Sequence, residues 1–203
     1  EAMMQVENYL DNTIMNTIET IDMKMLELAG QDETVRACIE QLDLAVIGEK
    51  EILIAADVHS SQRLSETINH DFFREFIKRI IRNHKRVFLL AETIAQEEQL
   101  EHFLVGKYEQ IEVAGHCAIE EKSNDFESVV NEINSADVIF SILPSPLQEQ
   151  FLTENKSKLD AKIWYGLSSD YAPRSRISRI SQIAGRLIHK KKLQSKLHKY
   201  NKD

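Results

Sequence analysis

Short apolar runs rich in β-branched residues alternate with longer stretches of helical periodicity along most of the chain, and this alternation constrains the fold more than any other feature. Four runs are clear, and each is bounded by polar residues or glycine: residues 85–91, 110–115, 136–143 and 161–167. Such runs are typical of strands buried on both faces of a parallel sheet, with helices as connections. The pattern predicts an α/β protein with a mostly parallel sheet flanked by helices.

Two weaker runs lie nearer the N-terminus, at residues 16–21 and 42–47, and would bring the sheet to six strands. The first could instead continue an N-terminal helix, because apolar residues from Val6 to Leu28 also fit a period of 3.6. β-Branched residues are dense between Thr13 and Ile21, which lowers helix propensity. We therefore predict a strand there.

Helices are predicted in the gaps between these runs. Asp71 is the expected N-cap of a helix over residues 72–83, and Thr93 precedes a helix with Gln96 at the capping-box position. The helix after Thr93 covers residues 94–104, and the remaining predicted helices cover residues 123–134, 147–159 and 174–198. No linker interrupts the first 170 residues, so we predict one domain over residues 1–172 and a helical appendage over 173–203.

The appendage differs from the rest of the chain in charge. The 203 residues carry a formal charge of −8, but residues 173–203 contain ten basic residues and one acidic residue. Residues 1–172 contain 15 basic and 32 acidic residues. An acidic domain therefore carries a basic tail, and the acidic balance argues against nucleic acid as a partner.

The cysteines and the hydropathy pattern bear on location. Cys38 and Cys117 lie far apart without CxxC spacing, which is typical of a reduced intracellular protein. No stretch approaches eighteen uninterrupted apolar residues, and the first residues lack the layout of a signal peptide. We expect a soluble, cytoplasmic protein, which does not exclude contact with a membrane surface.

Several common chemistries have no motif in this chain. There is no GxGxxG, Walker A or GxSxG pattern. The histidines form no HxxxH or HxH pairing with carboxylates at the spacing of metal ligands. We therefore expect no metal and no cofactor.

The most informative segment begins where the predicted strand 136–143 ends, in Ser141–Phe151. Ligands of open parallel sheets bind beyond the carboxyl ends of the strands, where this segment emerges. Pro146 suits the first turn of the following helix, and the free N–H groups of such a turn favour an anion such as a phosphate. Gln148 and Glu149 would lie in that turn. The alternative is a rigid strand-to-helix turn with a solvated Gln-Glu pair.

Residues 136–152 resemble the segment "aDvvfvglGsPkQEkwi" of the WecG/TagA/CpsF family of bacterial glycosyltransferases. Other segments resemble the family in the same order: 66–73 ("eRv.G.dl"), 85–91 ("g.rvfLlG"), 108–116 ("yP.l.ivG.h") and 161–168 ("a.v.igVGa"). The resemblance covers roughly residues 40–170. Only the Pro-x-Gln-Glu segment is specific to the family. The other segments support the resemblance because they occur in the same order.

The resemblance implies a Rossmann-like, metal-independent transferase. Such enzymes move a sugar, often N-acetylmannosamine, from a UDP-sugar donor to an undecaprenyl-diphosphate-linked acceptor at the inner face of the cell membrane, in cell-surface polysaccharide synthesis. Ser145, Gln148 and Glu149 would then line the donor site, with backbone groups of Ser141–Leu143 beside them.

The chain also departs from the family pattern. The family's "pDG.gvv" motif, whose Asp is thought to be the catalytic base, falls where this chain has Gly48 and Glu49. Glu49 could accept the proton of an acceptor hydroxyl, or it could be an ordinary first-turn residue of a helix that starts near Lys50. Thr67 and His70 stand where the family has Arg and Gly, and Arg63 is near enough to replace the missing cation.

Three more residues are candidates for substrate binding. His116 follows Gly115, which we expect to end its strand, so His116 would face the crevice or else cap the strand end. Arg174 and Arg176 could stabilise the leaving diphosphate of a metal-free site.

The tail forms a basic amphipathic helix in this interpretation, and such a helix can lie on an anionic membrane surface. It could equally cover the acidic body of the protein or pair with a second subunit in a homo-oligomer.

Two functional hypotheses remain from the sequence. The first is a divergent glycosyltransferase with Glu49 as base. The second is a catalytically inactive family member that acts as a binding or scaffolding subunit beside another glycosyltransferase, which the missing Asp-Gly and Arg favour. An unrelated Rossmann-like regulator is a third class, for which neither donor binding nor turnover is expected.

Overall fold

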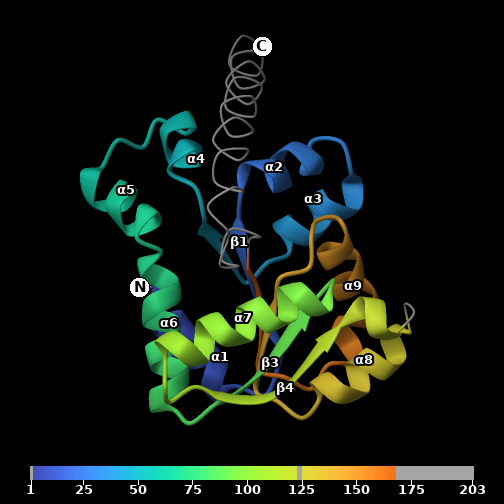
Figure 1. The fold of residues 1–203 in the computed structure, drawn as a ribbon. Helices are drawn as coiled ribbons and strands as arrows, with labels where there is room; N and C mark the ends of the chain where they lie inside the picture. Colours follow the sequence, from blue (N-terminus) through green and yellow to red (C-terminus); the bar gives the residue numbers. More distant parts are fainter. Residues whose placement is uncertain (1, 123–124, 168–203) are drawn as a thin grey trace.

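The computed structural model describes residues 2–122 and 125–167. Six parallel strands form one sheet in the order β2-β1-β6-β5-β3-β4 (Figure 1). The strands are β1 (Asn16–Ile21), β2 (Leu44–Ile47), β3 (Arg86–Ala91), β4 (Glu112–Ala118), β5 (Val138–Ser141) and β6 (Ile163–Gly166). The predicted α/β class and the parallel sheet are confirmed, including the strand at Asn16–Ile21 that could have been a helix.

Helices connect the strands in the described part of the chain. The larger ones are α1 (Ala2–Asp11), α3 (Glu33–Glu40), α5 (Ser61–Ile68), α6 (Asp71–Arg82), α7 (Ile94–Lys107), α8 (Phe126–Ile133) and α9 (Leu147–Asn155). The shorter ones are α2 (Met23–Ala29), α4 (Lys50–Ala55) and the 3-10 turns η1 (Ile119–Lys122) and η2 (Lys156–Lys158). None of the described helices is long and apolar enough to cross a membrane.

Two helix starts test the capping predictions. Thr93 and Gln96 form the predicted capping box at the start of α7. The N-cap of α6 was predicted wrongly, because helical geometry already begins at Asp71. His70 precedes it in the left-handed conformation, with φ 52°, and makes no side-chain cap. Asp71 therefore stabilises the first turn by charge and by its ion pair with Arg74.

The two faces of the sheet bury separate apolar cores. On one face, Phe76 of α6 and Leu100 of α7 pack against strand residues such as Leu89 and Tyr165. On the other face, Phe151 of α9 packs against Trp164 of β6, as expected for a core tryptophan. Because β3 is followed by a helix on the first face and β5 by a helix on the second, the two chain connections diverge between these adjacent strands. Such a switch point opens a crevice at the carboxyl ends of the strands.

The predicted domain 1–172 extends slightly beyond the described residues. The predicted appendage 173–203 lies entirely outside them, with its basic helix and with Arg174 and Arg176.

Candidate functional site at the carboxyl end of the sheet

The segment that leaves β5 builds the entrance to α9. Ser141 ends the strand, and Ile142–Pro146 carry the chain to the helix through a cis peptide bond between Ser145 and Pro146. The Ser145 hydroxyl donates a hydrogen bond of 2.6 Å to Oε1 of Glu149. The predicted donor-site residues Ser145 and Glu149 therefore contact each other across the first turn of α9.

The alternative of a solvated Gln-Glu pair is wrong. Gln148 is 4% exposed and Glu149 is fully buried. Some backbone donors of the turn are already used: the Gln148 N–H donates to Pro144 O at 3.1 Å, and the Gln150 N–H donates to Pro146 O at 3.1 Å. The start of α9 thus presents fewer free N–H groups to an anion than the sequence suggested.

Glu19 is a buried acid of this region that the sequence reasoning missed. It lies in β1, beside Gly166 of β6 in the strand register, and none of its surface is exposed. Neither carboxyl oxygen has a hydrogen-bond partner in the part of the chain that the structure describes. A signal existed in the sequence, because a strand expected to be buried on both faces has a glutamate near its centre.

Gly166 brings Glu19 and Gln148 together. A Cβ at this position would lie 2.6 Å from Gln148 Nε2, 2.9 Å from Gln148 Cδ and 2.9 Å from Glu19 Cγ. Only a residue without a side chain leaves room at this position for both the Gln148 amide and the Glu19 side chain. We call Glu19, Gln148 and Glu149 the buried acid layer.

Burial dominates the electrostatics of this layer. It raises the pKa of Glu19 well above the usual value, and the nearby Glu149 raises that pKa further. Burial also raises the pKa of Glu149, against the opposing effect of the Ser145 hydrogen bond. Burial and then the same two acids raise the pKa of the Cys38 thiol to about 12, so this cysteine is not a reactive thiolate.

Glu49 lies in the loop that follows the carboxyl end of β2. It follows β2 and occupies the N-cap position of α4, where its side chain makes no capping hydrogen bond. The preceding Gly48 donates its N–H to Ile21 O at 2.9 Å, which ties the loop to the end of β1. A Cβ on Gly48 would lie 2.6 Å from Thr20 Cγ2, so the close approach requires glycine. The loop is thereby held at the carboxyl edge.

Arg63 is part of a separate, more open region. It is exposed on α5 and lines a hollow of about 860 Å³ along the edge strand β2. Thr67 and His70, the two positions that depart from the family pattern, line the same hollow. We call this space, with the three residues that line it, the β2 hollow. Gln148 and Glu149 do not line it.

The reasoning that placed His116 in the crevice was wrong about its strand. Gly115 does not end β4, which continues to Ala118, so His116 lies within the edge strand. Its Nδ1 is 3.1 Å from Oε1 of Glu97, a buried residue of α7. Together with Glu101 these side chains could hold a divalent cation, since one ligand atom from each lies within 4.8 Å of the others.

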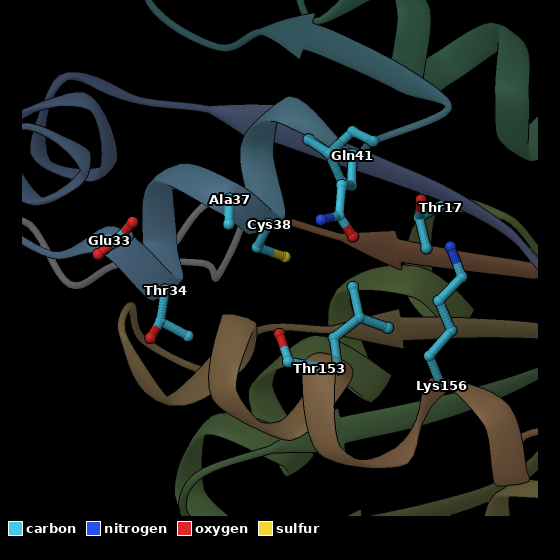
Figure 2. A pocket seen from close by; sticks show the side chains of 10 residues that line it. Thr17, Glu33, Thr34, Ala37, Cys38, Gln41, Thr153 and Lys156 are labelled. Carbon is cyan, nitrogen blue, oxygen red and sulfur yellow. The ribbon is translucent and has the colours of Figure 1, made fainter.

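A further cavity of about 480 Å³ lies between α3 and α9 and opens toward the beginning of β1. Figure 2 shows Thr34, Ala37 and Cys38 on the α3 side, with Thr153 and Lys156 across from them. Of the predicted site residues that the structure describes, none lines this cavity.

The family model for the WecG/TagA/CpsF glycosyl transferases matches residues 1–169, which is most of the chain. The protein belongs to this family and is a glycosyltransferase by class, so its substrates are a sugar donor and an acceptor. No curated protein matches the chain.

Proposed function

We propose that the protein transfers an N-acetylhexosamine-type sugar, N-acetylmannosamine-like, from a UDP-sugar donor to an undecaprenyl-diphosphate-linked acceptor in cell-surface polysaccharide synthesis. The observation that carries this proposal is the α9 entrance, where Ser145 and Glu149 bond to each other beside Gln148 at the switch point of the sheet. This is the Pro-x-Gln-Glu segment that the sequence shares with the family.

The reaction in this proposal is a direct displacement at the anomeric carbon. The acceptor hydroxyl oxygen forms the new bond to that carbon, its proton passes to the Glu49 carboxylate, and the bond to the diphosphate breaks with its electron pair leaving on UDP. Glu49 suits the role of base because its loop follows β2 and is held at the carboxyl edge of the sheet by the hydrogen bond from Gly48 N–H to Ile21 O.

The leaving diphosphate needs positive charge in a mechanism without a metal. We assign this role to Arg174 and Arg176, which are the first basic residues of the tail. The acceptor would approach over the β2 hollow, because β2 lines that hollow and leads directly to Glu49.

Calorimetry with UDP-N-acetylmannosamine and UDP-N-acetylglucosamine tests donor binding. We expect Gln148→Ala to weaken binding about tenfold or more, because the truncation removes an amide from a buried site. Gln150→Ala is the matched control, since Gln150 is exposed on the same helix and bonds only Glu154 among the described side chains. Absence of binding to either UDP-sugar, or equal affinity of the Gln148→Ala variant, contradicts the proposal.

A scaffolding subunit is the second candidate. It is favoured because this chain has Gly48 and Glu49 at the start of α4 and therefore lacks the Asp-Gly of the family pattern. Mixing the protein with donor and lipid-linked acceptor separates the two candidates: sugar transfer identifies the enzyme, and donor binding without transfer identifies the subunit.

The tail would bring the protein to the cytoplasmic face of the membrane as a peripheral protein, through ten basic residues. Removal of residues 174–203 should abolish sedimentation with anionic vesicles. Vesicle binding that survives the truncation would instead assign the tail to internal packing or to a homo-oligomer.

A further inference from the structure

The buried acid layer contains more hydrogen-bond acceptors than the described residues satisfy. Both oxygens of Glu19, Oε1 of Gln148 and Oε2 of Glu149 are buried without a hydrogen-bond partner among residues 2–122 and 125–167. A buried oxygen without a partner is destabilising by about 1–3 kcal/mol in general, so four in one layer need an explanation. Ionised glutamates cannot supply it, because a carboxylate only accepts hydrogen bonds.

A proton on Glu19 reduces this shortage, because it turns one of the four acceptors into a donor for another. A protonated carboxyl group becomes a donor, and the other buried acceptors of the layer without partners, Gln148 Oε1 and Glu149 Oε2, belong to α9. The Gln148 amide and the Glu19 side chain both lie beside Gly166, and Glu149 lies one residue further along α9. Ser145 already donates to the other oxygen of Glu149, so that carboxyl group is the better candidate to remain ionised.

We propose that Glu19 is a positioning residue, held as a neutral carboxylic acid whose O–H donates into the layer formed by Gln148 and Glu149 and so orients the Gln148 amide for the sugar donor. This inference rests on the proposed function, in which Gln148 contacts the donor. It adds a residue and a protonation state to the site.

The surroundings of Glu19 favour this state. The titratable groups that act on the layer are Glu149 on α9, Cys38 on α3, and Asp22 and Asp32 at the N-caps of α2 and α3. All of these are acids or a neutral thiol. The Lys156 ammonium lowers the pKa of Cys38, against the stronger effects of burial and the two acids. Burial among acids disfavours a second negative charge, as in other carboxyl pairs that share a proton.

A neutral Glu19 in the folded protein makes the free energy of unfolding depend on pH. A carboxyl group whose pKa is raised in the folded protein binds more protons there than in the unfolded chain, so its contribution is complete below the unfolded pKa of about 4.3 and is lost as pH rises toward the folded pKa. Over that window the unfolding equilibrium constant of the wild type should rise by up to about tenfold per pH unit from this group alone. Glu19→Gln keeps the shape and a donor but cannot titrate, so that part of the pH dependence should vanish.

The experiment compares the full-length wild type with Glu19→Gln and Glu19→Ala, and uses Glu97→Gln as the matched control. Glu97 is also a buried glutamate, but it lies on α7 beside His116. Unfolding by urea and calorimetric binding of UDP-N-acetylmannosamine are measured across the pH range in which the wild type stays folded.

We expect Glu19→Gln to bind the donor within about threefold of the wild type at low pH and to keep its affinity as pH rises, while the wild type weakens. The donor affinity of Glu19→Ala should be lower than that of the wild type by about tenfold or more. If Glu19→Ala does not fold, the comparison of Glu19→Gln with the wild type decides whether Glu19 is neutral. Glu97→Gln should follow the wild-type dependence of donor affinity on pH.

Identical pH dependence of unfolding in the wild type and Glu19→Gln overturns the neutral acid. Donor affinity that is the same in Glu19→Ala and the wild type, or that falls equally in Glu19→Gln and Glu19→Ala, overturns the positioning role. A wild type that binds no UDP-sugar contradicts the proposed function instead, and the unfolding data still decide whether Glu19 is protonated.

Discussion

The buried acid layer and the β2 hollow differ in how far their side chains are exposed to solvent. Glu19 and Glu149 are fully buried, and a strand glycine shapes the space they share with Gln148. Arg63 in the β2 hollow is exposed on a short helix. Side chains in the first region are held by packing, so changes there should alter stability and binding together. Side chains in the second can change with little effect on the folded state.

Glu49→Gln tests the open side of this comparison and should have the largest effect. We expect turnover to fall by about 100-fold to 10,000-fold, since the amide cannot accept the proton of the acceptor. The free energy of unfolding should change by less than about 1 kcal/mol, because the substitution keeps the size and shape of the side chain. Steady-state transfer assays and urea unfolding measure the two quantities. Unchanged turnover would remove Glu49 from the mechanism.

Gly166→Ala tests the buried side. The added methyl group would meet Gln148 Nε2 at 2.6 Å and Glu19 Cγ at 2.9 Å, so we expect destabilisation by about 1–3 kcal/mol together with weaker donor binding. Gly106→Ala on α7 is the control, because nothing lies within 4 Å of its added Cβ. That control should stabilise the protein by about 0.5–1 kcal/mol, as alanine does inside a helix. Equal stability of the two variants would show that the layer is not tightly packed.

Arg63→Ala should have the smallest effect. Its unfolding free energy should stay within about 0.5 kcal/mol of the wild type, because the side chain is exposed. We expect a several-fold rise in KM for the lipid-linked acceptor with unchanged affinity for the donor. Arg36→Ala, an exposed arginine on α3, is the control for the loss of one positive charge. A change in donor affinity would instead place Arg63 beside the Gln148 site.

The predicted strands and helices were largely recovered because each depends on local patterns. Strand 136–143 was predicted from a buried apolar run, and the structure has β5 within it. The capping box of Thr93 and Gln96 was likewise readable, since both partners lie within four residues. Strand ends were harder, and His116 was misplaced because a glycine in a strand looked like its end.

The candidate site was only partly predictable. Ser145, Gln148 and Glu149 are close in sequence, so the motif identified them together. Glu19 is more than 120 residues away from them, and no local pattern connects it to α9. Their meeting depends on the pairing of β1 with β6 and on the absence of a side chain at Gly166.

The sequence by itself determined the α/β class, the order of elements and the family to which the Pro-x-Gln-Glu segment belongs, because hydropathy periodicity and short motifs are local properties of the chain. The tertiary structure alone decided which side chains share one environment. It buried Glu149 against Ser145, placed Glu19 beside Gln148, and separated Arg63 and His116 from that layer. Burial and strand order depend on contacts between distant segments, and burial raises the pKa values of Glu19 and Glu149.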